Sequence, residues 1–516
     1  MRGGTANVNV IISDENVGSP VVTKDADCIV ALNQPSLDKF VGVVKEGGAL
    51  VVNADLCTVG AVKDGVKVYA VPANKIATDN FGGSKLANLV MLGAVVYATG
   101  AIDIAGLDET FAHVFEGGKA KFIPNNKKAF ELGYEYAKNL YEQAKDLGID
   151  MVVLDDGWFG SRNDDNSGLG DWKVNEEKLQ GSLGDLISRI NALGVKFGLW
   201  FEPEMVNEDS DLYREHPDWA IQIPGRKPVK GRNQLILDFS RKEVVDAVYE
   251  QMCQVLDQGN IEYVKWDMNR SMAEVYSMTA EEQGSVQYDY MLGLYDFLER
   301  IISRYPDLLI EGCSGGGGRF DAGMLYYTPQ IWCSDNTDAV DRVRIQYGTS
   351  FGYPVSAVGS HVSAVPNHQT GRKTSLHTRG VCAMAGTFGY ELDPAKMTDE
   401  ERREIREQIV EYKKYAQLVQ NGLYYRLSNP FAEEIGAWEF ASEDGKEVLV
   451  NVVMLEIHGN MTVNYVKLKG LCAGQFYKDS RTGKIYPAEA LMEVGIPLPL
   501  EFGEYKAYQI YLEMVE

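Results

Sequence analysis

The chain has 516 residues, 45% of them hydrophobic and 24% charged, so it is long enough for about two to four domains with buried cores. Its net charge of -24 argues against a nucleic-acid partner and against an anionic membrane surface, because both would repel the protein. The 7 cysteines are scattered without a CxxC pair, and no secretory leader or long apolar run is visible, so we expect a reduced, cytoplasmic protein without a metal site.

The first part of the chain alternates short apolar stretches with helical ones. Strands are expected where Val and Ile dominate, at 8–12, 28–32, 50–53 and 66–71. Helices are expected at 36–46 and 86–99. Strand and helix in alternation predict an α/β domain with a parallel sheet, which we assign to residues 1–136.

A second alternation starts with a helix at about 127–147. The strand-like segments that follow, most of them with an amphipathic helix behind, are 151–154, 196–201, 235–238, 263–266, 308–311, 330–332 and 354–359. Repeated strand–helix pairs with polar residues at the strand ends predict a (β/α)8 TIM barrel over residues 137–425. The eighth strand should precede the helix, but the only candidate, 119–124, is a poor strand, so the barrel is expected to be incomplete.

The character of the chain changes after a charged helix expected near 398–418. Short stretches then alternate apolar and polar residues, with a turn at 481–483, and the expected strands are 438–440, 448–453, 462–467 and 507–512. This pattern predicts a C-terminal antiparallel β-sandwich over residues 426–516.

Two carboxylates at strand ends carry the functional prediction. Asp267 follows the strand 263–266, and Asp335 follows the strand 330–332. A sugar-cleaving site needs one carboxylate that attacks or guides water and another that protonates the leaving oxygen. Lys265, Asp267 and Asn269 alternate, so they share one face of their strand, and a polar face inside a barrel is costly unless it pairs or binds a ligand. The alternative, a solvated outer face, is disfavoured because helices cover the outside of a barrel.

Other polar and aromatic residues follow the same strand ends. Asp155 and Asp156 would suit two vicinal hydroxyls of one sugar ring, and a helix cap is an equal alternative. Trp200, which two glutamates follow, either stacks on a sugar or belongs to the core, as an isolated Trp usually does. Arg232 is either a surface charge or a group that reaches a hydroxyl or a carboxylate.

A Gly-rich loop at 311–321 follows the strand 308–311. It lacks the Gly-Lys-Ser/Thr ending of a P-loop, so close approach of the backbone to a compact ligand explains the glycines better than a phosphate cradle. His361 and His368 lie near the last expected strand, where a structural role is the usual one.

From about residue 140 onward, five segments together resemble glycoside hydrolase family 36, the bacterial α-galactosidases: 154–160, 198–205, 265–270, 313–321 and 332–338. The resemblance implies a retaining enzyme with Asp267 as nucleophile and Asp335 as acid/base, and it leaves Asp338 as the rival for the second role. Retention implies carboxyl oxygens about 5 to 5.5 Å apart. It implies no cofactor and no metal. The residues that would hold galactose are Asp155, Asp156, Trp200, Arg232, Lys265, Asn269, Cys313, Gly316 and Trp332.

The N-terminal residues 1 to about 136 resemble another family, the γ subunit of 2-oxoacid:ferredoxin oxidoreductases. The segments that carry this resemblance are 2–7, 11–13, 31–40, 51–53 and 71–74. Both resemblances are partial, because the Gly-rich start of the γ family is missing, and so are the hydrolase's large β-sandwich and first barrel strand. The change from one family to the other falls at about 126–142, so we interpret the chain as a join of two truncated families.

Three hypotheses follow. The first is a retaining α-galactosidase that acts on melibiose- or raffinose-type ends. The second is a γ-like component of an oxidoreductase complex, which would need partners carrying thiamine diphosphate and iron–sulfur clusters, since the chain has no Cys cluster. The third is an inactive chimera. A homo-oligomer is one possible state of assembly.

Overall fold

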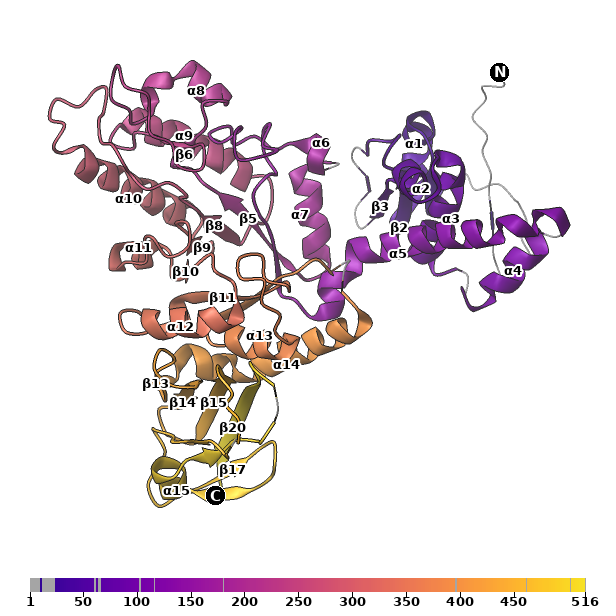
Figure 1. The fold of residues 1–516 in the computed structure, drawn as a ribbon. Coiled ribbons are helices and arrows are strands. Elements are labelled where there is room, and N and C mark those ends of the chain that lie inside the picture. Colours follow the sequence, from indigo (N-terminus) through magenta and orange to yellow (C-terminus); the bar gives the residue numbers. More distant parts are fainter. Residues whose placement is uncertain are drawn as a thin grey trace. The chain divides into compact units, whose positions relative to one another are not determined.

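The structure is a computed structural model, drawn in Figure 1. The residues that it describes are 10–11, 24–59, 62–63, 66–101, 104–115, 117–179, 181–394, 397–460, 462–501 and 503–515. The strand expected at 8–12 lies almost entirely outside them. The chain divides into two units, Met1–Asp146 with Asn175–Val195 and Leu147–Val174 with Lys196–Glu516, and each is described by itself. No helix in the described part of the chain is long and apolar enough to cross a membrane.

The first unit contains a three-stranded parallel sheet whose spatial order follows the chain. Its strands are β1 (Ala26–Ala31), β2 (Val44–Asn53) and β3 (Lys67–Val71). The helices of this part are α1 (Gln34–Phe40), α2 (Ala73–Phe81), α3 (Ala87–Thr99), α4 (Leu107–Val114), α5 (Ile123–Leu147), α6 (Glu176–Leu179) and α7 (Leu183–Ala192). Alternate residues of β2 face opposite sides, so Val51 packs into one apolar cluster and Val52 into the other. The predicted α/β domain with a parallel sheet is confirmed.

The helix expected at 36–46 is shorter than predicted. Helix α1 begins after Asn33, whose side-chain oxygen accepts from the Ser36 N–H at 3.0 Å, and it ends at Phe40. The β-branched Val41, Val43 and Val44 disfavour its continuation, and Val44 begins β2 instead.

Residues 119–124 are helical rather than a barrel strand, because they form a 3-10 turn and the first residues of α5. Helices α3 and α5 cross with their backbones in close contact. A Cβ on Gly93 would lie 1.9 Å from the Phe130 carbonyl oxygen, and one on Gly133 would lie 1.8 Å from that of Val90. The two glycines therefore allow a crossing that no larger residue would permit.

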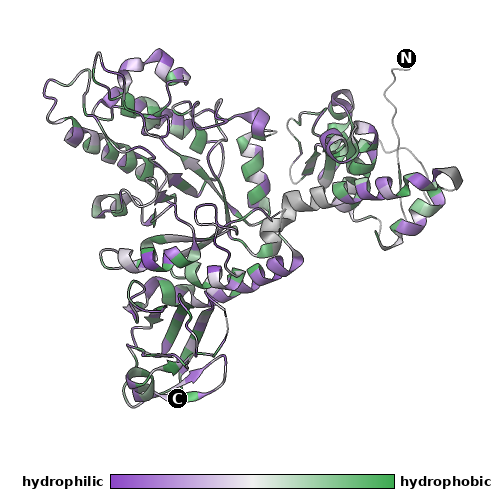
Figure 2. Ribbon diagram, in the orientation of Figure 1, coloured by the Kyte–Doolittle hydropathy of each residue, from purple (hydrophilic) through white to green (hydrophobic). Residues whose placement is uncertain are grey.

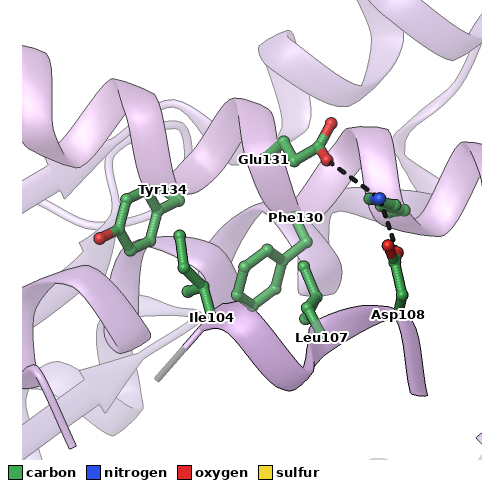
Figure 3. Close-up of a pocket in the computed structure, with 7 residues that line it drawn as sticks. Ile104, Leu107, Asp108, Phe130, Glu131 and Tyr134 are labelled. Carbon is green, nitrogen blue, oxygen red and sulfur yellow. Dashed lines mark ion pairs between the residues drawn. The ribbon is translucent and has the colours of Figure 1, made fainter. Parts of the chain in front are cut away.

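A shallow pocket of about 180 Å³ lies between α4 and α5, shown in Figure 3. Ile104, Leu107, Phe130 and Tyr134 give it an apolar lining. Lys127 is held there by Asp108 at 2.6 Å and by Glu131 at 3.9 Å. Because two carboxylates flank its one lysine, the pocket is not suited to an anionic ligand.

The second unit is built on a seven-stranded parallel sheet that forms an incomplete barrel, as predicted. In spatial order its strands are β12 (Thr387–Glu391), β11 (Val358–Ser363), β10 (Gln330–Trp332), β9 (Leu309–Gly312), β8 (Tyr263–Trp266), β5 (Lys196–Phe201) and β4 (Met151–Leu154). The helices between them are α8 (Asp211–Glu215), α9 (Lys242–Leu256), α10 (Val286–Arg304), α11 (Ala322–Tyr327), α12 (Ala339–Thr349) and α13 (Leu376–Ala383).

One of the predicted barrel strands is wrong and another was missed. Leu235–Ile236 form β7, which pairs antiparallel with β6 (Met205–Val206) outside the barrel sheet. The missed strand is β12, which pairs with β11 from Gly359 to Ser363. The strand expected at 354–359 is also displaced, because Val355–Ala357 form a 3-10 turn before β11.

Strands β4 and β12 end the sheet, and in the described part of the chain neither has a second neighbouring strand. Both are less buried than the strands between them. Val153, on β4, is 37% exposed, whereas Val264, on the central β8, is fully buried. The barrel is therefore open between these two edges.

The C-terminal part is antiparallel β, as predicted. Its main sheet has the order β13 (Leu423–Arg426), β14 (Ile435–Ala441), β15 (Glu447–Met454), β20 (Ala507–Met514), β17 (Phe476–Asp479) and β18 (Ile485–Pro487). The remaining elements are α14 (Asp399–Asn421), α15 (Ala488–Glu493) and the strand pair β16 (Tyr465–Val466) and β19 (Ile496–Pro497). Figure 2 shows apolar residues concentrated in the central strands of this sheet, and buried clusters lie on both of its faces.

Candidate active site

Asp267, the predicted nucleophile, follows β8 directly and is 6% exposed. Its backbone N–H donates to the Phe201 carbonyl at 2.8 Å, which continues the β5–β8 pairing by one residue. Oδ2 accepts from Trp200 Nε1 at 3.2 Å and from Asn269 Nδ2 at 2.7 Å, and Oδ1 accepts from the Met268 N–H at 2.8 Å. Three donors therefore hold this carboxylate in one orientation.

Trp200 takes the core position, one of the two alternatives predicted for it, and makes a contact that was not predicted. The ring is 2% exposed and stacks on Phe159 with centroids 6.2 Å apart, so it belongs to the core. Its indole N–H points the other way, to Asp267. The side chain thus anchors the end of β5 in the core and orients the carboxylate of Asp267.

Asp335, the predicted acid/base, follows β10. Oδ1 accepts from Trp332 Nε1 at 3.1 Å. Gly316, in the Gly-rich loop, has φ +87°, and a Cβ there would lie 2.8 Å from Ser334 Cα and 3.0 Å from the Asp335 nitrogen. Glycine is therefore needed at 316 so that the loop can pack against the segment that carries the acid/base candidate.

The rival carboxylate, Asp338, is engaged as a helix cap. Its Oδ1 accepts from the Val340 and Asp341 N–H groups, each at 3.0 Å, at the start of α12. Oδ2 accepts from Thr370 Oγ1 at 2.7 Å, and Arg372 pairs with the same carboxylate. Asp338 is 2% exposed, so its oxygens are occupied and hidden, which favours Asp335 for the acid/base role.

Lys265 contacts two of the other predicted residues. Its Nζ donates to Asp155 Oδ2 at 2.9 Å and lies 5.8 Å from the centre of the Trp332 ring. Burial acts to lower the pKa of Lys265, but the charges of Asp155 and Glu311 outweigh it and raise that pKa, so the lysine stays charged. Burial, with the charge of Asp267, raises the pKa of Cys313, which keeps that cysteine a neutral thiol beside the carboxylate.

Asp156 and Arg232 belong to one chain of ion pairs that runs through Arg162 and Asp165. The sequence analysis did not single out Arg162, which is buried. Arg162, whose side chain is 2% exposed, approaches Asp156 with Nη2–Oδ2 at 2.8 Å and Asp165 at 3.3 Å. Arg232 lies 3.6 Å from the other oxygen of Asp165. Because no helix begins after Asp155 until α6, the helix-cap alternative for these two aspartates is excluded.

Two buried glutamates after β5, Glu202 and Glu204, were also missed as partners of the site. Glu202 accepts from the Asn269 N–H, and Glu204 accepts from Trp266 Nε1 at 2.9 Å and pairs with Arg319 at 2.8 Å. A pair of acids in an apolar Trp-Phe-Glu-Pro-Glu-Met run was the available hint, because such burial requires partners.

Two further chemical features bear on the site. All 7 cysteines are free thiols. Among the described residues, no group of three His, Cys, Asp or Glu side chains is placed to hold a metal ion. Around Asp267 and Asp335 the described side chains supply hydrogen-bond donors and aromatic rings.

Comparison with known proteins assigns the parts of the chain to families. Residues 119–422 match the Melibiase model, and residues 435–512 match the glycosyl hydrolase family 36 C-terminal domain. Residues 1–136 match a different model, pyruvate ferredoxin/flavodoxin oxidoreductase.

Individual relatives agree with the larger match. A bifunctional alpha-galactosidase/sucrose kinase from Mediterraneibacter gnavus is 66% identical over 371 residues, or 72% of this chain and 39% of that protein. Alpha-galactosidase AgaA from Geobacillus stearothermophilus is 48% identical over 406 residues, or 78% of this chain and 56% of that protein. Its crystal structure superimposes with a TM-score of 0.72 and 50% identity, covering 73% of this chain and 53% of that one.

The chain thus spans about half or less of the length of these curated relatives. The Melibiase model alone covers more than half of the chain. The chain therefore belongs to the melibiase family, within glycoside hydrolase family 36, and carries an N-terminal segment that matches an oxidoreductase family.

Proposed function

We propose that the chain is a retaining α-galactosidase that releases terminal α-galactosyl residues from oligosaccharides. The observation that carries the proposal is the carboxylate of Asp267, held by three donors at the end of β8 in an incomplete barrel, with Asp335 at the end of β10, two strands away in the same sheet. Structures of the Geobacillus stearothermophilus relative in complex with raffinose and with stachyose, both 49% identical to this chain, support substrates of that type.

The proposed reaction has two displacements. Asp267 Oδ1 or Oδ2 attacks the anomeric carbon while Asp335 gives its proton to the leaving oxygen, and a galactosyl-enzyme forms. Asp335, now ionised, then takes a proton from water, which attacks the same carbon and frees Asp267. Two inversions restore the α configuration.

The remaining predicted residues are proposed to hold the sugar. Asp155 and Asp156 accept from its hydroxyls, while Lys265 and Arg232 donate to them. The indole of Trp332 would contact the sugar through its ring, and the charges of Lys265 and Arg342 lie 5.8 and 4.5 Å from the ring centre. Trp200, Asn269, Cys313 and Gly316 complete the set by shaping the wall around Asp267 and Asp335.

The division into three domains, at 1–136, 137–425 and 426–516, stays part of this proposal. So does a homo-oligomeric state. The match of residues 1–136 to an oxidoreductase model favours one alternative, a component of a 2-oxoacid oxidoreductase complex. Stable co-purification with subunits that carry thiamine diphosphate would support that alternative.

The decisive experiment is hydrolysis of an aryl α-galactoside by the full chain and by three variants. Asp267→Ala and Asp335→Ala should lose turnover, whereas Asp338→Asn, a matched carboxylate three residues from Asp335, should keep a measurable rate if it folds. Azide should restore Asp267→Ala as β-galactosyl azide and Asp335→Ala as α-galactosyl azide, because it replaces the nucleophile in one and attacks the covalent intermediate in the other. A folded wild-type chain without turnover would leave the inactive chimera as the conclusion.

A further inference from the structure

Glu202 and Glu204 are two residues apart, both fully buried, and yet differ in their partners. Glu204 faces Arg319, with Nη1–Oε2 at 2.9 Å and Nη2–Oε1 at 2.8 Å. Among the described residues no Lys, Arg or His forms an ion pair with Glu202. Its Oε1 accepts from the Asn269 N–H at 2.5 Å and its Oε2 from Gln234 Nε2 at 3.0 Å.

The amide of Gln234 gives a second, independent observation. Gln234 is fully buried, and its Oε1 has no hydrogen-bond donor among the described residues. Amide oxygen and nitrogen are assigned from their hydrogen bonds, so a half-turn of this amide is an alternative placement that brings Oε1 to face Glu202 and Nε2 to the present position of Oε1. In that placement a proton on Glu202 supplies the donor for Oε1, which an ionised Glu202 is unable to do.

We propose that Glu202 is a positioning residue that carries a proton in the working enzyme and orients the nucleophile Asp267 through Asn269, an inference that rests on the proposed function. Glu202 fixes the backbone N–H of Asn269, and the Asn269 side chain donates to Asp267 Oδ2 at 2.7 Å. As a neutral acid, Glu202 can lie beside the nucleophile without placing a second negative charge there.

The charges around Glu202 agree with this assignment. Burial, followed by the charge of Asp267, raises the pKa of Glu202 to about 8, although the Asn269 hydrogen bonds and the charge of Arg232 act in the opposite direction. Arg162 also faces Glu202, but Asp156 and Asp165 already pair with it. Around neutral pH the protonated form therefore prevails.

The first test measures stability and needs no catalysis. Because Glu202 binds its proton more tightly in the folded chain than in the unfolded one, the stability that it contributes is fully present below about pH 4.5 and is lost as the pH rises to about 8. Relative to wild type, the urea midpoint of Glu202→Gln should rise steadily between pH 5 and pH 8. A constant difference over that range overturns the assigned proton.

The second test uses kcat/KM for 2,4-dinitrophenyl α-galactoside. This leaving group needs no proton, so ionisation of Asp335 does not shape the profile. Ionised Glu202 would be an unpaired buried anion beside Asp267, and the resulting displacement of the nucleophile should lower wild-type kcat/KM above about pH 8. Glu202→Gln, which keeps the shape of the protonated acid, should lack that fall. Glu202→Ala should lose about 10- to 100-fold in kcat, and the Gln variant should recover most of it.

Glu439 provides the matched control. It is a fully buried glutamate on β14, in the C-terminal sheet, and burial raises its pKa to about 8 as well. Glu439→Gln should show the same trend in stability with pH but keep the wild-type fall in kcat/KM. If Glu202→Gln and wild type share one kinetic profile, or if wild type gains activity above pH 8, the positioning role is overturned. If no variant turns over substrate, the proposed function fails, and the unfolding data alone still decide the protonation of Glu202.

Discussion

Replacement of Glu204 by Gln should destabilise the second unit through Arg319. The Gln oxygen can still accept from Trp266 Nε1, which now donates to Glu204 Oε1, and the Tyr290 hydroxyl, which now donates to Oε2, can instead accept from the Gln amide NH2. The charge of Arg319 loses its partner, and only 16% of that side chain is exposed, so water replaces little of the loss. Breaking a buried ion pair from one side costs roughly 3–5 kcal/mol, and the partial exposure of Arg319 places our expectation at the lower end, about 3 kcal/mol.

Urea unfolding followed by Trp fluorescence measures the loss in free energy of unfolding of the second unit. All 7 tryptophans lie in the second unit, so the signal does not report the N-terminal unit. Glu202→Gln, the same substitution two residues away, should cost clearly less at pH 7, because its partner set contains no ion pair.

A double-mutant cycle with Arg319→Met isolates the pair. Removing both charges leaves no uncompensated ion, so the double variant should be more stable than the sum of the single changes predicts. A cost below about 1 kcal/mol for Glu204→Gln, or strict additivity in the cycle, would refute the reasoning.

Three further outcomes are expected. Gly316→Ala should lower kcat at least about tenfold, because a Cβ 2.8 Å from Ser334 Cα would displace the segment that carries the acid/base candidate Asp335. Steady-state kinetics test this prediction, and circular dichroism checks that the variant is folded. Trp200→Phe should lower kcat/KM by about 10- to 100-fold, since one hydrogen bond to the Asp267 carboxylate is lost, and an unchanged value would exclude that contact. Glu439→Gln should become more stable relative to wild type by up to about 1.4 kcal/mol per pH unit between pH 5 and pH 8, and a flat difference in urea unfolding would contradict it.

Much of the architecture could be predicted because hydrophobic periodicity reports it directly. The strands at 151–154, 196–201 and 263–266 were predicted with the bounds that the structure gives them. The error at 235–238 has a local cause, because a short apolar run looks the same in a barrel strand and in a two-residue antiparallel pair. Strand β12 escaped detection because its Thr-Phe-Gly-Tyr-Glu sequence contains a glycine and follows α13 after only three residues.

Some residues of the candidate site could likewise be predicted from the sequence, and others could not. Lys265, Asp267 and Asn269 could be placed because strand alternation fixes their common face. Arg162 could not, since nothing in a polar loop distinguishes a buried arginine from a solvated one. Trp200 was predicted either to stack on a sugar or to belong to the core; its ring lies in the core, and its N–H contact with Asp267 was not predicted.

The barrel sheet has two open edges, at β4 and at β12, and the two differ from each other. In a parallel sheet the edge at β4 and the edge at β12 are different surfaces, and neither has a strand partner on its outer side among the described residues. Parallel edge pairing between copies would join β12 of one molecule to β4 of the next and leave a free edge of each kind at the ends. Such a contact is heterologous, and unless its rotation closes a ring it propagates into growing chains, whereas antiparallel pairing of like edges about a two-fold axis would close a dimer. The two edges of the incomplete barrel are therefore not equivalent. An assembly formed by parallel pairing would have a free β4 edge at one end and a free β12 edge at the other.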